Sequence, residues 1–513
     1  MSTITHANWS AVDTPEFHER FEAALAGCEG LGQRTHELLL AGEAGGARPT
    51  VDHVSPADRS RRLGAVVQAS PGDVAAAVAA ARHAQAEWKR TSIAQRVVVM
   101  RRLRELIDRD RFEVMALLSL EIGKNRFEAA TEVEEALSLI DAYCDDVVAA
   151  RGFDVHYPPL GDEENVSVLR PYGVWGILGP FNFPFALSAG PAAAALLMGN
   201  VVVVKPPEAA PLACLRLGAL AREAGLPAGA FQVLNGGPDV GRALTTDAGV
   251  DGVGFTGSFE VGQAIRRALD GKPCIAEMGG KNAAIVLSSA DVAVAGPAIA
   301  RSAFRYSGQK CSATSRVFAT PDVIEPLIAT VVEEASRFKL GIPWELGTEV
   351  GSLICPAARR RYDEAIEAAR AAGAKVLVSD PPAELQEGPY AGPAVIVGLP
   401  AEHELLRTEL FAPIVCVQPV ADLDEALRLA NDVPFGLTAG LYTTDRDEID
   451  RFLEEIEAGV VYVNRRSGAT TGAWVGYQSF GGWKGSGSTG VNAHGPYYVQ
   501  QFAREQSRTV ATR

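Results

Sequence analysis

The sequence predicts an α/β protein whose centre is a doubly wound parallel sheet. From Val174 onward, short runs rich in β-branched and aromatic residues alternate with helical stretches. The run at 201–204 consists of valines alone, which is typical of a parallel strand covered on both faces. The chain has 513 residues, more than one hydrophobic core normally holds, so we expect two or three domains.

The segment before the sheet is predicted to be a helical cover. Residues 1 to about 50 form a polar lead, rich in alanine and glutamate, with helical periodicity. Amphipathic helices are expected over 73–88, 92–109 and 111–145, and the last is interrupted at Gly123 and Lys124.

Two α/β series follow. In the first, the strands are expected at 173–178, 200–205, 231–235, 250–256, 273–278 and 282–288, and the helices at 185–198, 210–225 and 259–270. The second begins at about Asp291 with a helix that ends near Tyr306. Its later elements are a strand at 315–320, a helix at 358–372, strands at 375–378 and 412–420, and a helix at 424–432. We expect this series to form a second sheet.

Charge and cysteine usage narrow the class of protein. Asp and Glu outnumber Lys and Arg by 63 to 48, and the net charge of −15 opposes binding to nucleic acid. The seven cysteines lie far apart without a C-x-x-C pair, so we expect neither disulfides nor a metal site. The N-terminus lacks a basic and apolar leader. These features favour a cytoplasmic protein.

A charge-free run at 171–204 is long enough to span a bilayer. It is broken by Gly179-Pro180, Pro184, Gly190-Pro191 and Gly199-Asn200, whose turns would leave backbone groups unsatisfied in lipid. We therefore expect a buried strand, turn, helix and strand, and no membrane partner.

Two features suggest a nucleotide site, although the G-x-G-x-x-G fingerprint is absent. Gly257 and Gly262 lie where a strand gives way to a helix, whose first amides suit a pyrophosphate. Lys205 and Glu208 end the valine strand at the carboxyl edge of the sheet, where such folds bind ligands. Taken alone, the glycines favour an ordinary turn, and the Lys205–Glu208 pair favours a solvated loop.

Cys311 is the candidate nucleophile. Its flanks are polar, a neighbouring cation such as Lys310 can lower a thiol pKa, and the thiolate is the attacking species. Glu277 ends a strand and is followed by two glycines, which suits a movable general base. Most cysteines and lone glutamates are structural, so neither residue alone establishes a function.

Six motifs occur in the order seen in aldehyde dehydrogenases, and together they cover most of the chain. They are GPFNFPF (179–185), KPPE (205–208), FTGSFEVG (255–262), EMGGK (277–281), GQKCSA (308–313) and ELFAP (409–413). The chain thus resembles that family. The resemblance implies a Rossmann-type NAD-binding domain, an α/β catalytic domain and a small β flap for oligomerisation.

The implied domains are 1–151 with 173–288 for NAD binding, 289–487 for catalysis, and 152–172 with 488–513 for the flap. An exposed strand edge on such a flap favours a homodimer or a larger homo-oligomer.

The resemblance also implies the chemistry. Cys311 attacks the aldehyde carbon, and the Asn182 amide stabilises the oxyanion together with the Cys311 main-chain N–H. NAD accepts the hydride, and Glu277 activates the water that hydrolyses the thioester. The residues implied for the cofactor are Lys205 and Glu208 at the adenosine ribose, Gly257, Ser258 and Gly262 at the pyrophosphate, and Glu409 and Phe411 at the nicotinamide ribose.

Two residues depart from the family pattern. Met278 stands where leucine is usual, a change that conserves volume. Ala412 stands where glycine is usual, and we expect its Cβ to affect the loop if the glycine served for backbone freedom.

Residues 464–487 resemble one branch of the family, the 1-pyrroline-5-carboxylate dehydrogenases, which oxidise glutamate γ-semialdehyde in proline catabolism. The shared pattern is TGA-x-VG-x-Q-x-FGG. The residues implied for the substrate are Gly472, Ala473 and Ser312 at its α-carboxylate, Phe480 and Phe185 along its aliphatic part, and Glu135 at its ammonium group.

Two alternatives stay open. The same mechanism could serve succinic semialdehyde or a broad range of aldehydes, since Ser138 and Ser479 depart from the branch pattern. A binding protein without turnover is disfavoured by the intact Asn182, Glu277 and Cys311.

Overall fold

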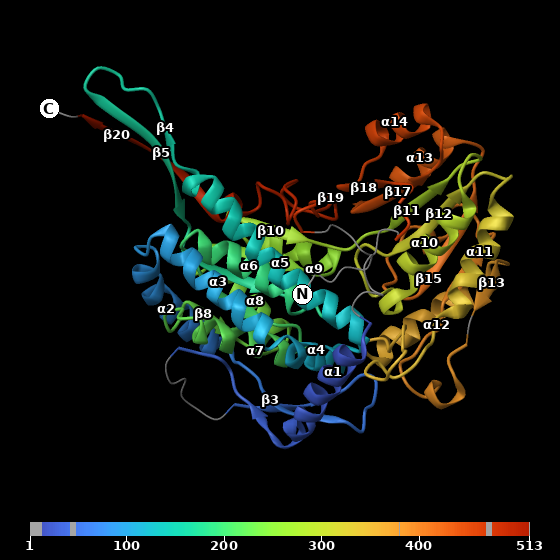
Figure 1. Ribbon diagram of the computed structural model, residues 1–513, viewed down its shortest axis with the longest axis horizontal. Coiled ribbons are helices and arrows are strands. Elements are labelled where there is room, and N and C mark those ends of the chain that lie inside the picture. Colours follow the sequence, from blue (N-terminus) through green and yellow to red (C-terminus); the bar gives the residue numbers. More distant parts are fainter. Residues whose placement is uncertain (1–12, 42–47, 379, 468–474, 512–513) are drawn as a thin grey trace.

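The computed structural model describes residues 13–41, 48–378, 380–467 and 475–511. Two parallel sheets, each flanked by helices, lie side by side, and an antiparallel arm projects from one of them (Figure 1). The helices are α1 (Pro15–Gly27), α2 (Pro71–Trp88), α3 (Ile93–Arg109), α4 (Arg111–Ile122), α5 (Arg126–Ala149), α6 (Ala186–Leu197), α7 (Pro211–Glu223), α8 (Pro238–Thr246), α9 (Phe259–Ala268), α10 (Val292–Phe304), α11 (Ile324–Arg337), α12 (Pro356–Ala371), α13 (Leu423–Asn431) and α14 (Arg446–Glu455).

The five-stranded sheet has the order β10-β9-β6-β7-β8, with all strands parallel. Its strands are β6 (Val174–Leu178), β7 (Val201–Lys205), β8 (Phe231–Val233), β9 (Gly252–Thr256) and β10 (Cys274–Glu277). Numbered along the chain, this is the 3-2-1-4-5 order of a Rossmann sheet, with its switch point between β6 and β9. The predicted doubly wound sheet is confirmed. Ligands of such sheets bind beyond the carboxyl ends of the strands at this point.

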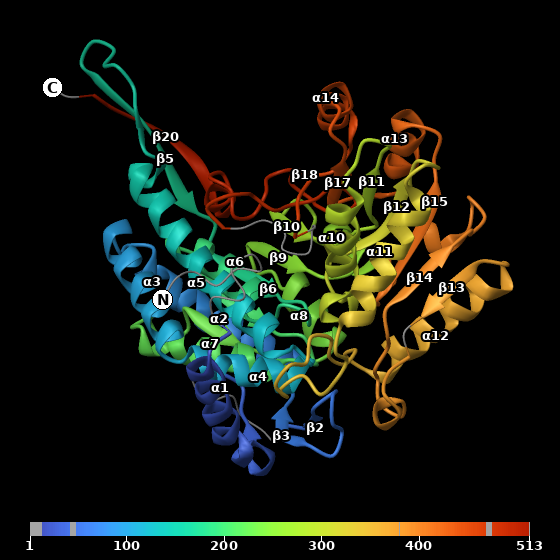
Figure 2. The same ribbon diagram turned by 45° about the vertical axis from the view of Figure 1, so that its right-hand side comes forward.

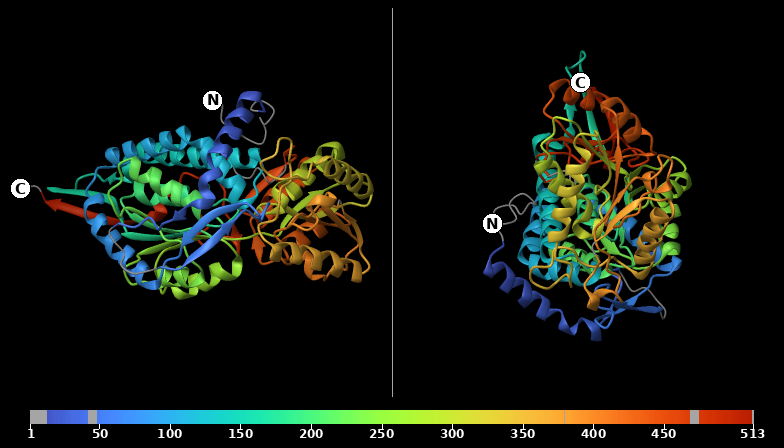
Figure 3. Two further views of the ribbon diagram at one scale, coloured as in Figure 1. Left: turned by 90° about the horizontal axis from the view of Figure 1, so that it is seen from below. Right: turned by 90° about the vertical axis from the view of Figure 1, so that its right-hand side faces the viewer.

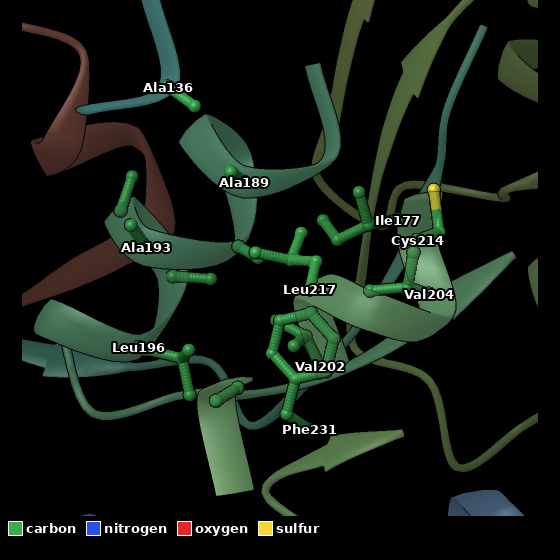
Figure 4. Packing of buried hydrophobic residues seen from close by; sticks show 14 of the residues in the cluster. Ala136, Ile177, Ala189, Ala193, Leu196, Val202, Val204, Cys214, Leu217 and Phe231 are labelled. Carbon is green, nitrogen blue, oxygen red and sulfur yellow. The ribbon is translucent and has the colours of Figure 1, made fainter. Parts of the chain in front are cut away.

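The charge-free segment at 171–204 forms the centre of the main core. Its strands β6 and β7 pack with α6 and with Leu217 of α7 (Figure 4). The alanines of α6 permit close packing, and a Cβ on Gly190 would lie only 2.8 Å from Leu139 of α5. The expected strand, turn, helix and strand are confirmed. In the described part of the chain, no helix combines the length and apolar character needed to cross a membrane.

The seven-stranded sheet has the order β13-β14-β15-β12-β11-β17-β18, parallel except for β13. Its strands are β11 (Asn282–Val286), β12 (Thr314–Ala319), β13 (Lys375–Val378), β14 (Ala394–Val397), β15 (Ile414–Pro419), β17 (Thr438–Tyr442) and β18 (Val460–Val463). We expected 282–288 to belong to the first sheet, and this is wrong because β11 pairs with β12 and β17. An apolar run is equally suited to either buried sheet, so the pattern could not assign it.

The two sheets meet at the short link between β10 and β11. Strand β10 ends at Glu277 and β11 begins at Asn282. The carboxyl edge of the first sheet therefore adjoins the amino edge of the second. Figure 2 shows the two sheets next to each other. Because Cys311 precedes β12 and Glu409 precedes β15, both lie at this junction.

The N-terminal segment departs from the helical lead expected up to residue 50. After α1, a three-stranded sheet forms from β1 (Thr35–His36), β2 (Thr50–Val54) and β3 (Arg62–Val67). The shortness of β1, which pairs in parallel with the later β3, explains why local periodicity did not reveal it.

The arm consists of β4 (Val155–His156), β5 (Glu163–Pro171) and β20 (Ala503–Ala511), and β5 pairs antiparallel with β20 along its whole length. The arm extends away from the body, as Figure 1 and the left view of Figure 3 show. We expected the flap to begin at 488, but Tyr498, Val499 and Phe502 are buried in the main core. The C-terminal part of the arm thus begins at Ala503, because large apolar side chains keep the preceding residues on the body.

Candidate active site

The loop that carries Cys311 is fixed by the first residue of β11. The loop follows a short 3-10 turn, η4 (Arg305–Gly308). Asn282 donates its side-chain amide to the carbonyl oxygens of Cys311 at 2.7 Å and of Ala313 at 2.9 Å. The main-chain N–H of Ser312 donates to the sulfur of Cys311. Cys311 is therefore held by the backbone of its own loop and by a side chain of the neighbouring strand.

Asn182 lies in the loop that follows β6, at the switch point of the first sheet. Its Nδ2 donates to the main-chain oxygen of Gln309 at 3.0 Å, and its side chain is buried. An amide nitrogen has two hydrogens, so one donor is committed to Gln309 and the second can face a ligand. The structure thus brings Asn182 to the loop of Cys311.

Glu277 is the last residue of β10. Its Oε2 accepts a hydrogen bond from the main-chain N–H of Gly482 at 3.1 Å. Burial raises the pKa of this carboxyl to about 8. A carboxylate with a pKa near neutrality is a stronger base than an ordinary one, which is what general base catalysis requires.

The expected lowering of the Cys311 thiol pKa by Lys310 is wrong. The pKa of the Cys311 thiol is raised to about 12, first by burial and then by the negative charges of Glu409, Glu277 and Glu135. The ammonium of Lys310 points to the Glu128 carboxylate, 2.6 Å away. Three predicted carboxylates are therefore close enough to Cys311 to raise the pKa of its thiol, whereas the Lys310 ammonium pairs with Glu128.

The two glycines after Glu277, expected to give it freedom, are required by close packing. A Cβ on Gly280 would lie 2.8 Å from the carbonyl oxygen of Cys311, and a Cβ on Gly279 would overlap the Glu409 carboxylate. Gly280 also donates its N–H to Glu409 at 2.9 Å. The absence of side chains at Gly279 and Gly280 lets the end of β10, the loop of Cys311 and Glu409 pack closely together.

Lys205 and Glu208 lie at the carboxyl end of β7, as predicted. Burial lowers the pKa of Lys205, and the nearby charge of Glu208 opposes this shift. The Glu208 side chain is exposed, and a Cβ on Gly237 would approach its carboxylate to 3.2 Å. A Cβ on Gly241 would lie 3.4 Å from the Cδ atom of Lys205. The two glycines therefore pack closely against the side chains of Lys205 and Glu208, and the Glu208 carboxylate remains accessible to a ligand.

The turn after β9 is the strand-to-helix turn that the sequence predicts. Ser258 caps α9 and accepts the N–H of Val261 at 3.4 Å. Gly257 lies before the cap, but Gly262 faces inward, where an added Cβ would overlap Met278. The glycine at 262 thus packs the helix against the sheet, while Gly257 and Ser258 form the open turn.

Glu409 and Phe411 lie at the amino edge of the second sheet. Burial raises the pKa of Glu409 to about 7. The ring of Phe411 meets that of Phe181 edge to face, with centroids 5.6 Å apart. Phe411 has a left-handed backbone, with φ of 55°, whereas Ala412 does not. The backbone freedom that we expected glycine to supply at 412 is therefore not needed there.

Glu135, His494 and Phe480 meet on one side of the site. Glu135 Oε1 lies 3.7 Å from His494 Nε2, and the His494 and Phe480 rings stack with centroids 6.3 Å apart. Burial raises the pKa of Glu135 to about 7 and lowers that of His494 to about 4. His494 is thus neutral near pH 7 and leaves Glu135 available to a ligand cation.

The other substrate residues are placed differently. Ser312 is buried beside Cys311. Phe185 has no exposed surface and belongs to the main core, so the expected contact with a substrate beside Phe480 is not supported. Gly472 and Ala473 lie outside the described residues.

Sequence reasoning missed three residues that position the site, namely Asn282, Gln309 and His494. Asn282 directly follows the EMGGK motif and Gln309 lies within GQKCSA. An amide side chain at the start of a strand was the available signal, since such positions often bind loop carbonyls. No local signal distinguishes His494, because its partners are remote in sequence.

Comparison with known proteins identifies the family of the chain. Residues 44–507 match the model of the aldehyde dehydrogenase family. The chain is 33% identical over 503 residues to the 1-pyrroline-5-carboxylate dehydrogenase of Geobacillus thermodenitrificans, a similarity that covers 96% of each chain.

Two solved structures have the same fold. The 1-pyrroline-5-carboxylate dehydrogenase from Thermus with bound NAD has a TM-score of 0.91 at 30% identity, covering 98% of this chain and 97% of that one. Proline utilization A from Bdellovibrio bacteriovorus has a TM-score of 0.92 at 30% identity over 96% of this chain, which spans 52% of that protein. With its ordered motifs, its Rossmann sheet and a match over most of its length, the chain belongs to the aldehyde dehydrogenase family.

Proposed function

We propose that the chain is an NAD-dependent dehydrogenase that oxidises L-glutamate γ-semialdehyde, the open form of 1-pyrroline-5-carboxylate, to L-glutamate in proline catabolism. The observation that carries this proposal is that Asn182 is hydrogen-bonded to the loop of Cys311, whose thiol also lies within electrostatic reach of Glu277 and Glu135. The similarity to 1-pyrroline-5-carboxylate dehydrogenases along the chain supports the substrate.

The first step is attack by Cys311 on the aldehyde carbon. The thiolate is the nucleophile, so the thiol must first lose its proton. The carbonyl oxygen then becomes an oxyanion, and the second amide hydrogen of Asn182 donates to it together with the Cys311 main-chain N–H. The product is a thiohemiacetal, whose carbon carries the hydride to be removed. NAD, when bound, accepts this hydride.

The second step is hydrolysis of the resulting thioester. Glu277 in its ionised form takes a proton from a water molecule, and the hydroxide formed adds to the thioester carbon. Collapse of the adduct breaks the carbon–sulfur bond, releases the acid and restores Cys311. The raised pKa of Glu277, about 8, makes it a competent base for this transfer.

The residues proposed to hold NAD line the carboxyl edge of the first sheet. Lys205 and Glu208 would hold the adenosine ribose, and the Glu208 carboxylate would repel a 2′-phosphate. The turn at Gly257 and Ser258 would receive the pyrophosphate at the start of α9. Glu409 with Phe411 would hold the nicotinamide ribose.

The substrate's two charges have proposed partners in the site. The Glu135 carboxylate would bind the ammonium group, and Ser312 would bind the α-carboxylate with the backbone of Gly472 and Ala473. The ring of Phe480 would cover the aliphatic chain. The Glu135 carboxylate would not contribute to the binding of an aldehyde that has no ammonium group.

We also propose that the arm forms a homodimer or larger homo-oligomer, and that the enzyme acts in the cytoplasm. Supporting the first, Leu160 and Val510 of the arm are 73% and 58% exposed, and exposed apolar side chains on a projecting antiparallel arm favour contact with a partner. Supporting the second, all seven cysteines are free thiols, and a nucleophilic Cys311 needs a reducing compartment.

The test is a steady-state comparison of 1-pyrroline-5-carboxylate, succinic semialdehyde and simple aldehydes, each with NAD and with NADP. We expect the highest kcat/KM with 1-pyrroline-5-carboxylate and NAD. Equal or higher values with succinic semialdehyde would overturn the proposed substrate, and a preference for NADP would overturn the proposed role of Glu208.

A further inference from the structure

Helix α5 carries three carboxylates along the face that borders the site. Glu128, Glu132 and Glu135 are spaced by four and three residues, so they lie on one side of the helix. The helix runs beside α6 in the main body (Figure 2). Glu128 and Glu132 are 2% and 0% exposed. Burying a carboxylate costs free energy unless it is paired with a cation or hydrogen-bond donors. The partners of these carboxylates therefore identify the segments that α5 anchors.

Glu132 holds the end of the loop that carries Asn182. Its Oε1 accepts the main-chain N–H groups of Phe185 at 2.8 Å and of Ala186 at 3.2 Å, where α6 begins. Its Oε2 pairs with the ammonium of Lys124 at 2.6 Å, and neither side chain is exposed. One carboxylate thus fixes both the start of α6 and a buried cation.

Lys124 joins the loops of the two sheets. Its ammonium lies 3.3 Å from the ring centroid of Phe183, the neighbour of Asn182, and 5.0 Å from that of Tyr306. Tyr306 belongs to η4, which leads to Cys311, and its hydroxyl donates to the Ile122 carbonyl at 3.1 Å. The cation therefore contacts the loop of Asn182 and the segment that precedes the nucleophile.

Glu128 holds the nucleophile loop itself, one helical turn away from Glu132. Its Oε2 lies 2.6 Å from the ammonium of Lys310, which directly precedes Cys311, and both side chains are almost fully buried. The two ion pairs tie two loops from different sheets to one helix.

We propose that Lys124, Glu128 and Glu132 are positioning residues that hold Asn182 and Cys311 in register by anchoring both loops to α5. The inference rests on the proposed function for the roles of Asn182 and Cys311. Misplacing a catalytic group by about 1 Å can cost about 100-fold in rate. The two loops lie more than a hundred residues apart in sequence, so a shared rigid anchor is a direct way to set their separation.

The test compares Lys124→Met and Glu132→Gln with a matched control on the same helix. Glu134 forms a buried ion pair with Arg111 at 2.5 Å, and the charges that act on Glu134 belong to α3 and α4, not to either loop of the site. Glu134→Gln therefore removes a similar buried pair without touching either loop. Each variant is assayed for kcat and KM on the aldehyde that the wild-type enzyme oxidises best, for NAD affinity, and for thermal midpoint.

We expect Lys124→Met and Glu132→Gln to lower kcat by about 100-fold with smaller changes in KM and NAD affinity. Glu134→Gln should lower the thermal midpoint but keep kcat. The double variant Lys124→Met/Glu132→Gln removes both charges, which avoids a lone buried ion and protects folding. The double variant should still have a low kcat. The single variant Lys124→Arg, which keeps the positive charge, should retain most of the wild-type kcat.

A double-mutant cycle tests whether Glu132 acts through Asn182. In an Asn182→Ala background, Glu132→Gln should cost much less in kcat than in the wild type. Equal costs in both backgrounds, wild-type kcat in the folded double variant, or an equal loss in Glu134→Gln would overturn the proposal. The assay uses whichever aldehyde the wild-type enzyme oxidises best. An error in the proposed substrate alone therefore does not affect the interpretation of this cycle.

The rate at which iodoacetamide alkylates Cys311 gives a readout that needs no substrate. A displaced nucleophile loop should change this rate in Glu128→Gln and Lys124→Met and leave it unchanged in Glu134→Gln. An unchanged rate in all three variants would remove the nucleophile loop from the proposal and thereby overturn it.

Discussion

The side-chain amide of Asn182 donates to the main-chain carbonyl of Gln309 at 3.0 Å, two residues before Cys311. This bond joins the loop after β6 of the five-stranded sheet to the loop before β12 of the seven-stranded sheet. The site therefore lies where the carboxyl edge of one sheet meets the amino edge of the other, and neither sheet alone contains it.

Cys311→Ala should abolish NADH formation, because no other group in the mechanism forms the bond to the aldehyde carbon. NAD affinity should change little, because Lys205 and Glu208 belong to the end of β7. Absorbance at the NADH band measures turnover, and calorimetric titration measures NAD binding. Undiminished turnover in the folded variant would refute the role of the sulfur.

Glu277→Gln should slow hydrolysis of the thioester and lower kcat by about 10²- to 10⁴-fold, the usual contribution of a general base. The acyl-enzyme should then accumulate, with an added mass on Cys311 after acid quenching. Glu277→Asp, which keeps the carboxylate, should retain more activity than Gln. Normal turnover without accumulation would contradict the assignment.

The activity should rise with pH through about 8 as Glu277 loses its proton. Burial raises the folded-state pKa of this group above its usual value, so its contribution to stability is complete below about 4.5 and is lost as pH rises through about 8. The thermal midpoint of the wild type, measured relative to that of Glu277→Gln, should therefore decrease as the pH rises from 5 to 9. A constant difference across that range would contradict the raised pKa.

Glu135→Gln should raise KM for 1-pyrroline-5-carboxylate by about 10- to 100-fold, the equivalent of a charged hydrogen bond worth about 1.5–3 kcal/mol. The KM for succinic semialdehyde should stay unchanged because that substrate has no ammonium group. The second substrate serves as the internal control. Equal effects on both would show that Glu135 shapes the site rather than binding the ammonium.

The double variant Leu160→Lys/Val510→Lys should dissociate the proposed oligomer, because it places two charges in an apolar interface. Both side chains are largely exposed in the single chain, so folding should be preserved. Light scattering coupled to size-exclusion chromatography measures the mass. Leu346→Lys, at a residue that is 56% exposed and lies off the arm, is the matched control. An unchanged mass in the double variant would contradict the proposal that the arm forms the oligomer interface.

Local signals accounted for most of the elements. Gly123, expected to interrupt a long helix, ends α4 with a left-handed φ of 71°, and Asn125 caps the start of α5. Glycine tolerates that conformation and asparagine accepts the first amides of a helix, so both signals act within a few residues. The candidate residues Asn182, Glu277 and Cys311 were found in the same way, from short motifs in a fixed order.

The sequence by itself determined many of the elements, the switch-point turns and the family, because periodicity, caps and motifs are local properties. Tertiary structure decided that β11 joins the second sheet, and that Lys310 turns from Cys311 to Glu128. These outcomes depend on partners far away in the chain, and a buried charge goes where an opposite charge compensates its lost hydration.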